Sequence, residues 1–363
     1  MNSPQELQTL VAALCDLRRT GFADAAAMAT ITQTRGSTFR RAGTSMLVHA
    51  DGRVICELAG GCPQADIVLR AQQVMEQGRT QLVHYNRQDN YDVLIETGCG
   101  GELSVLVEPI SDEDDLRWLD ALAHVLEQRQ QGAIATVFAD AQGHVLPRPL
   151  RMLCDQQGVL FTSIGQPLLA LLGEQLDRLH QRVAGCVFPP TQGDAQVLMG
   201  RLRPRPALVI IGAHVGARAM ADLGHALGWK VSVVDADAGR LSMLPEHVER
   251  VVAGPASVRE QLHLDEFTAL VAMTHRLELD LEYLQALGEA PLSYVGAIGS
   301  RERAQRMAHA LDGSIDPLYM PAGLDIGSDT PQEIALAVTA EILATFNARE
   351  GRRLSLTAGS IHS

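Results

Sequence analysis

The stretch Leu208-Val-Ile-Ile-Gly-Ala-His-Val-Gly-Ala-Arg-Ala-Met220 has the pattern of a buried strand that runs through a glycine turn into a helix. This order is typical of the opening of a Rossmann domain, whose standard turn is G-x-G-x-x-G/A. The second glycine of that turn lets the backbone touch a pyrophosphate at the helix N-terminus. Here the three positions hold Gly212, His214 and Ala217, so a side chain occupies the position where a phosphate would contact the backbone. The pattern predicts the fold and argues against tight dinucleotide binding at this turn.

The chain beyond this turn alternates between predicted strands and helices. Strands are expected at residues 207–211, 230–235, 250–253, 268–273 and 293–298. Such alternation indicates a parallel, doubly wound sheet with helices on both faces, and ligands bind these sheets at the carboxyl ends of the strands. Asp235 ends the second strand, at the spacing expected of a ribose-binding carboxylate.

Three other strand ends carry polar groups. His275 follows one strand and is either a ligand contact or a cap for the next helix. Gly299-Ser300-Arg301 follows another strand, in an order that suits an anion at a helix start. The loop at 323–330 contains Asp325, and its last residues are expected to cap a helix that begins at Pro331.

The N-terminal half contains the loop Arg35-Gly-Ser-Thr-Phe-Arg-Arg-Ala-Gly-Thr44, which has two glycines, three hydroxyls and three arginines. Arginine forks and small hydroxyls around a flexible glycine suit an oxyanion or a phosphate, with Gly36, Ser37 and Arg40 as candidates. A solvated basic turn explains the same composition equally well.

Two cysteines are flanked by glycines. In Gly60-Gly61-Cys62-Pro63 the proline suits the first position of a helix, which places Cys62 at or beside the N-cap. The positive end of a helix lowers the pKa of such a thiol and favours the thiolate. Gly98-Cys99-Gly100-Gly101 precedes a predicted strand at 102–108, and its glycines leave room for a ligand near the backbone. The two thiols therefore either share a site or form a disulfide, depending on their separation.

The composition is that of a soluble globular protein. The chain has 363 residues, 46% of them hydrophobic, and a formal net charge of −13. This acidity argues against a nucleic-acid role, which needs a basic face. No apolar run reaches the length of a membrane span, and residues 1–21 lack the apolar core of a signal peptide. We expect a cytoplasmic protein that binds neither nucleic acid nor membrane.

The length of the chain predicts two domains. An N-terminal α+β domain is expected over residues 1–183, a linker over 184–206, a Rossmann-like domain over 207–349 and a polar tail over 350–363. The linker prediction depends on the proline and glycine content of that segment.

Taken in order, these motifs resemble the XdhC/CoxI family, the accessory proteins of molybdenum hydroxylases such as xanthine dehydrogenase. The N-terminal block consists of Gly36-Ser37, Arg40, Gly43, Met46, Gly60-Gly61-Cys62, Cys99-Gly100-Gly101 and Glu108-Pro109. The C-terminal block consists of Gly212-Ala213, Asp235, Thr274-His275, Gly296, Gly299-Ser300-Arg301, Gly323-Leu-Asp-Ile-Gly327, Thr330-Pro331 and Ala340-Glu341. Each motif is weak alone, but their order and spacing along the chain are specific.

The resemblance implies a chaperone and not a conventional enzyme. Such a protein binds the molybdenum cofactor, a molybdopterin with or without a nucleotide, while a cysteine desulfurase replaces a molybdenum oxygen with sulfur. It then delivers the cofactor to its client, a molybdenum hydroxylase. Thiolates suit a thiophilic metal, so Cys62 and Cys99 are the residues expected near molybdenum. The expected cofactor-binding residues are Gly36, Ser37, Arg40, Gly60, Gly61, Cys62, Cys99, Gly100, Gly101, Gly212, His214, Asp235, His275, Gly299, Ser300, Arg301 and Asp325. A homodimer is also expected.

Four residues depart from the family pattern: Phe39 replaces a proline, Gln64 a glutamate, Arg276 an aspartate and His214 a glycine. Two other functions stay open. One is an NAD(P)-dependent oxidoreductase that uses Gly212 and Asp235, against which His214 argues. The other is a scaffold that joins the hydroxylase to the desulfurase without binding the cofactor.

Overall fold

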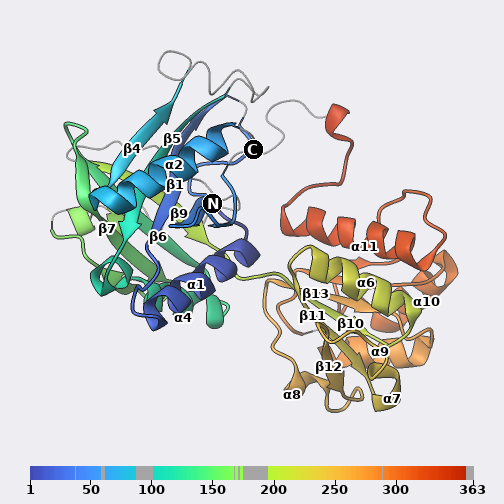
Figure 1. The fold of residues 1–363 in the computed structure, drawn as a ribbon. Coiled ribbons are helices and arrows are strands. Elements are labelled where there is room, and N and C mark those ends of the chain that lie inside the picture. The colour runs from blue at the N-terminus through green and yellow to red at the C-terminus, as the bar shows by residue number, and fades with distance from the viewer. Residues whose placement is uncertain are drawn as a thin grey trace. The chain divides into compact units, whose positions relative to one another are not determined.

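The computed structural model describes residues 1–36, 38–58, 62–86, 101–166, 168–170, 172–174, 195–287 and 289–356. The chain divides into two compact units, Met1–Pro204 (unit 1) and Arg205–Ser363 (unit 2) (Figure 1). Unit 1 contains two antiparallel sheets and unit 2 one parallel sheet. The predicted fold class, an N-terminal α+β domain followed by a Rossmann-like doubly wound domain, is confirmed. No helix in the described part of the chain is long and apolar enough to cross a bilayer.

The first sheet of unit 1 has the strand order β3-β2-β1-β5-β4. Its strands are β1 (Ala26–Arg35), β2 (Ser45–His49), β3 (Val54–Ile55), β4 (Gln81–Tyr85) and β5 (Glu102–Ile110). Helix α2 (Cys62–Gln77) covers one face of this sheet (Figure 1). Ile67, Ala71 and Val74 recur at helical spacing and are fully buried against the sheet, which explains the packing.

The second sheet of unit 1 has the order β8-β7-β6-β9. Its strands are β6 (Gly132–Asp140), β7 (Val145–Asp155), β8 (Val159–Thr162) and β9 (Ala195–Leu202). Leu106 of the first sheet packs against Phe138 and Leu198 of the second, which joins the two sheets through one core. The helices α1 (Pro4–Arg19), η1 (Glu113–Leu116) and α4 (Leu119–Glu127) form a second cluster, which includes Met28 of the first sheet and Leu153 and Leu202 of the second.

The linker expected over residues 184–206 is wrong for residues 195–202, which form β9. This strand pairs with β6 along its whole length, and Val197, Leu198, Met199 and Leu202 are buried. The boundary between the units falls at Pro204. The prolines and glycines on either side of the strand dominated the local composition, while the partner that stabilises it begins far away at Gly132.

Unit 2 is a parallel sheet in the order β12-β11-β10-β13-β14-β15. Its strands are β10 (Ala207–Ile211), β11 (Lys230–Asp235), β12 (Glu249–Val252), β13 (Thr268–Ala272), β14 (Tyr294–Ala297) and β15 (Leu318–Tyr319). The helices are α6 (Val215–Ala226), α7 (Ala238–Leu241), α8 (Val258–Gln261), α9 (Leu277–Leu287), α10 (Arg301–Leu311) and α11 (Pro331–Phe346). α6 and α11 cover one face, and α9 and α10 cover the other. Numbered along the chain the order is 3-2-1-4-5-6, which places the Rossmann crevice at the carboxyl ends of β10 and β13.

Candidate functional site

Three strand ends of the five-stranded sheet, those of β1, β4 and β5, lie at the same end of the sheet. β1 ends at Arg35, which is in register with Glu102 at the start of β5. Tyr85, the last residue of β4, is in register with Leu103. The glycine loop that follows β1 and both ends of the connection between β4 and β5 therefore lie together.

Helix α2 begins at the same end of the sheet. The Tyr85 hydroxyl donates a 2.8 Å hydrogen bond to the carboxylate of Asp66, near the start of the helix. Burial, together with this bond to Asp66, raises the pKa of the Tyr85 phenol. Gln64 links α2 to Leu58, since its Oε1 accepts a 3.2 Å hydrogen bond from the Leu58 backbone N–H. Cys62 is the first residue of α2, so its backbone lies at this end of the sheet.

A polar cavity of about 190 Å³ lies beside the glycine loop. It is lined by Gln33, Thr34, Arg35, His84, Tyr85, Asn86, Glu102, Leu103 and Ser104. His84 Nδ1 lies 2.8 Å from Ser104 Oγ, which fixes the imidazole on the cavity wall. Arg35 and Glu102 give the wall both signs of charge. The cavity therefore offers donors and acceptors to a polar ligand, and it lies at the ends of the two strands that flank residues 87–100.

Arg40, a predicted phosphate ligand, has an internal partner. Its guanidinium forms an ion pair with Glu6 in the first turn of α1. Burial alone would raise the pKa of Glu6, but hydrogen bonds from the Ser3 N–H and from Arg40 outweigh it and lower the pKa. The Nε of Arg40 is buried and has no acceptor within the described residues. Arg40 thus ties its loop to α1.

The glycine turn of unit 2 is packed against the neighbouring strand. Gly212 has φ of +104°, and a Cβ at this position would lie 2.9 Å from the Thr274 Cα. Its own N–H donates to the Val234 carbonyl at 2.8 Å. Only glycine fits both the conformation and the contact, so Gly212 is explained by packing alone.

Both carboxylate oxygens of Asp235, the predicted ribose ligand, accept hydrogen bonds from backbone N–H groups of unit 2. Oδ2 accepts a 2.9 Å hydrogen bond from the Ala213 N–H, and Oδ1 accepts one of the same length from the Asp237 N–H. Arg240 lies 3.6 Å away. The carboxylate holds the glycine turn to the end of β11, with 8% of the residue exposed.

His214 is the N-cap of α6 and occupies both of its ring nitrogens. Nδ1 accepts a 3.1 Å hydrogen bond from the Gly216 N–H, and Nε2 lies 2.7 Å from the Met273 carbonyl, to which it donates in the matching neutral tautomer. The His275 ring lies 4.2 Å from the His214 ring, centroid to centroid. Burial lowers the pKa of His214. A backbone N–H that a phosphate would use in the standard turn is therefore already bound.

Sequence reasoning missed a buried network at the next strand end. The Asp280 side chain is fully buried; its Oδ1 accepts hydrogen bonds from the Thr274 N–H at 2.9 Å and the Thr274 hydroxyl at 2.7 Å. Its Oδ2 pairs with the Arg303 guanidinium at 2.5 Å. Arg303 lies in the first turn of α10, whose N-cap is Ser300. The local sequence shows two acids in the first turn of α9, Glu278 and Asp280, and does not single out Asp280 because its basic partner is 23 residues away.

The remaining predicted residues of unit 2 are exposed. They are His275, Ser300, Arg301 and Asp325, and Gly299 is half-buried beside Arg303. The loop that contains Asp325 is fixed at its start, since Glu341 accepts a 2.9 Å hydrogen bond from the Gly323 N–H and a 2.6 Å one from the Tyr294 hydroxyl. Helix α11 begins at Pro331 as predicted, with Thr330 as its cap.

Two family models match the chain. The model described as the XdhC Rossmann domain matches residues 208–342, and the model of the XdhC and CoxI family matches residues 23–86. The chain belongs to the XdhC and CoxI family. The resemblance expected from the sequence is thereby confirmed, with one model on each unit.

Three relatives extend this family match over most of the chain. A Bacillus subtilis (strain 168) protein, named as a probable xanthine dehydrogenase subunit, is 28% identical over 326 residues, 88% of this chain and 93% of that protein. The molybdenum cofactor insertion chaperone PaoD of Escherichia coli (strain K12) is 25% identical over 325 residues, 87% of this chain and 82% of PaoD. A crystal structure of a xanthine dehydrogenase from Bacillus halodurans superposes with a TM-score of 0.76 at 25% identity, over 96% of this chain and 97% of that one.

Several of the expected XdhC-type site residues lie outside the described residues. They are Ser37, Gly60, Gly61, Cys99 and Gly100, together with the side chain of Cys62. The predicted neighbours Gly36, with φ of +71°, and Gly101 adjoin the sheet end described above. Within the described ranges, no group of three His, Cys, Asp or Glu side chains is arranged to hold a metal ion. The thiol pair expected near molybdenum therefore stays a prediction.

Proposed function

We propose that this protein is a chaperone of the molybdenum cofactor. It binds the molybdopterin in unit 1, holds it while a cysteine desulfurase replaces a molybdenum oxygen with sulfur, and inserts it into a molybdenum hydroxylase. The name of PaoD and that of the Bacillus subtilis relative support this role, because the chain matches both over its two units. We also propose that it acts as a homodimer in the cytoplasm.

One observation carries the proposal. The start of α2, where Cys62 lies, and the two strand ends that flank the Cys99 segment meet at one end of the five-stranded sheet. The polar cavity at that end supplies Arg35, His84 and Asn86 as groups for a pterin or its phosphate. A thiolate at a helix start is a suitable ligand for molybdenum, and α2 begins at the end of the sheet where this cavity lies.

The experiment measures how much cofactor the purified chain retains. Protein mixed with molybdenum cofactor is passed over a gel-filtration column, and the cofactor in the protein peak is quantified. We expect Cys62→Ala and Cys99→Ala each to weaken retention about tenfold, the scale typical of losing a group that supports a metal. Unchanged retention in both variants would remove the thiol assignment.

Cys56→Ala is the matched control. Burial raises the pKa of the Cys56 thiol to about 11, so this sulfur stays protonated at neutral pH. A protonated thiol is a poor metal ligand. Cys56→Ala should therefore retain as much cofactor as the unmodified chain.

A second candidate function is that of a permanent hydroxylase subunit. The name of the Bacillus subtilis relative favours it, since that protein is described as a subunit. The two roles differ in stoichiometry: a subunit copurifies one-to-one with active hydroxylase, whereas a chaperone leaves after insertion. A scaffold that only joins hydroxylase to desulfurase would survive the loss of both thiols and would still pull down both partners.

Nicotinamide chemistry has less support. His214 and Asp235 use their polar atoms on the turn itself, which leaves fewer groups for a dinucleotide. We expect no change in NADH or NADPH fluorescence on titration with the protein. A saturable change would restore the oxidoreductase alternative.

A further inference from the structure

A buried ion pair connects the two sheets of unit 1. Glu108 of β5 and Arg151 of β7 form it, and their side chains are 5% and 6% exposed. The Arg151 guanidinium carbon lies 4.8 Å from the centroid of the Trp118 ring. Taking two charges out of water costs several kcal/mol per ion, so a pair that is kept here needs further partners to offset the cost.

The pair leaves hydrogen-bonding capacity unused. A guanidinium has five N–H donors, yet among the described residues the Arg151 side chain donates only to Oε1 of Glu108. The other oxygen of Glu108 has no donor within the same residues. Both side chains line two cavities, here called the inner cavity and the outer groove, so a bound molecule can reach them.

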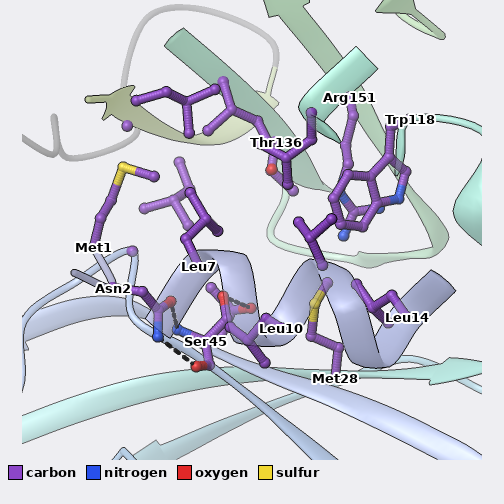
Figure 2. A pocket seen from close by; sticks show the side chains of 18 of the residues that line it. Met1, Asn2, Leu7, Leu10, Leu14, Met28, Ser45, Trp118, Thr136 and Arg151 are labelled. Atoms are coloured by element: carbon purple, nitrogen blue, oxygen red, sulfur yellow. Dashed lines mark hydrogen bonds between the residues drawn. The ribbon is translucent and has the colours of Figure 1, made fainter. Parts of the chain in front are cut away.

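The inner cavity is too small for a ring. It measures about 70 Å³ and lies against α1, with Leu7, Leu10 and Leu14 on one side and Arg151 and Trp118 on the other (Figure 2). A void of about 150 Å³ is known to hold benzene. The inner cavity therefore has room for only a few atoms.

The outer groove is large enough. It measures about 200 Å³ and is lined, besides the ion pair and Trp118, by Asp114, Asp115, Arg117, Arg148, Pro149, Leu150, Phe161 and Ser163. Pro149, Leu150 and Phe161 supply apolar surface for a planar ring. Of the basic residues on the rim, Arg148 already pairs with Asp115 at 2.8 Å and with Asp114 at 3.4 Å. Besides the ion pair, the lining carries Asp114 and Asp115 against Arg117 and Arg148, so its charges balance and the groove does not favour an anion.

The charges of the groove define the ligand that it fits. Glu108 and Arg151 sum to zero, so a charged ligand would be buried without a counterion. Arg151 can donate a hydrogen bond to a ligand, and Glu108 beside it can accept one. A ligand that matches this pair needs an acceptor next to a donor, as in the adjacent C=O and N–H groups of a cyclic amide. We propose that the outer groove binds a small, neutral, planar cyclic amide of the pyrimidinone or oxopurine class. The inference does not depend on the proposed cofactor role.

Calorimetric titration of the full-length protein tests the proposal, with hypoxanthine as the probe and purine as the matched control. The two differ in the carbonyl and its adjacent N–H. Losing those hydrogen bonds should weaken purine binding about tenfold or more relative to hypoxanthine. Equal affinities, or no heat from hypoxanthine at millimolar concentration, would overturn the proposal.

A double variant locates the site without leaving an unpaired buried charge. Replacing both members of a buried ion pair by apolar residues is often neutral or stabilising, so Glu108→Leu with Arg151→Met should fold. It should lose hypoxanthine binding while its unfolding midpoint stays the same or rises. The control variant Arg79→Met, at an exposed residue of unit 1 outside the groove lining, should bind hypoxanthine within about twofold of the unmodified chain. If the folded double variant binds as the unmodified chain does, the groove is not the site.

Two cysteine variants separate this site from the cofactor site. Cys62→Ala and Cys99→Ala should bind hypoxanthine like the unmodified chain, whatever they do to cofactor retention. A loss of hypoxanthine binding in either would mean that the probe occupies the proposed cofactor site, and the outer groove assignment would be wrong.

Discussion

The two glycine loops of this chain differ in what their polar groups do. In unit 2 the N–H groups of Gly212, Ala213 and Gly216 donate to the Val234 carbonyl, the Asp235 carboxylate and the His214 ring. In unit 1 the loop after β1 adjoins a cavity whose wall carries arginine, histidine and glutamate side chains. A Rossmann turn whose N–H groups are bound within the protein has a structural role. The fold of a domain therefore does not determine where its chemistry takes place.

The largest expected effect concerns the ion pair between Asp280 and Arg303, which should stabilise the strand end beside the glycine turn of unit 2. Arg303→Met leaves the Asp280 carboxylate, which is fully buried, without a cation. The free energy of unfolding of unit 2 should fall by about 3 kcal/mol. Urea unfolding followed by Trp229 fluorescence measures it in a Trp118→Phe background, because the chain has two tryptophans, one in each unit.

Arg301→Met is the control for this change. Arg301 is exposed at the first position of the same helix, so its loss should cost no more than about 0.5 kcal/mol. If the two variants lose the same stability, Asp280 does not need its cation and the ion pair is weaker than the contact geometry indicates.

Gly212→Ala tests the turn itself. Alanine would adopt φ of +104° and place its Cβ 2.9 Å from the Thr274 Cα, a backbone atom that cannot move aside alone. We expect a loss of about 2 kcal/mol in the stability of unit 2. Gly254→Ala is the matched control, since a Cβ there meets nothing within 4 Å. If Gly212→Ala loses no more unfolding free energy than the control does, the turn accommodates a side chain easily and its close packing does not stabilise unit 2.

The sequence was informative where structure is local. The strands at 207–211 and 230–235, and the helix that Pro331 opens, have the predicted bounds. Each follows from apolar runs or from a cap a few residues away. Pro63 likewise predicted that Cys62 lies at the start of a helix, and α2 begins at Cys62.

The parts that could not be predicted depend on distant partners. β9 is stabilised by β6, and the ring of His214 by a carbonyl 59 residues along the chain. Sequence reasoning treated His214 as a flaw in a phosphate turn because the acceptor at Met273 is visible only in three dimensions. The Glu108–Arg151 pair, 43 residues apart, was missed for the same reason.

Acid should loosen the unit 2 turn. Burial lowers the pKa of His214 below its ordinary value of 6.5, and the nearby His275 lowers it further, while Asp235 and Asp280 raise it. The unfolded chain therefore binds this proton at a higher pH than the folded one, so the contribution to stability is full above pH 6.5 and is lost as the pH falls below it. His214→Asn keeps a capping side chain but cannot titrate. The difference in unfolding free energy between the two proteins should be constant above pH 7 and shrink toward pH 5; a difference independent of pH would contradict the assignment.

The smallest expected effect decides whether the turn has kept any contact with phosphate. His214→Gly restores the glycine of the standard motif and releases the Gly216 N–H from the imidazole. If the turn faces a ligand, one recovered hydrogen bond should tighten ADP binding about threefold to tenfold, measured by calorimetry. His214→Ser is the sharper control, because a serine N-cap binds the same N–H with a smaller side chain. A gain in the glycine variant alone identifies the N–H as the phosphate donor, whereas a gain in both points to the bulk of the imidazole. If neither variant gains ADP affinity, this edge of the Rossmann sheet has only a structural role, in contrast to the cavity beside the glycine loop of unit 1.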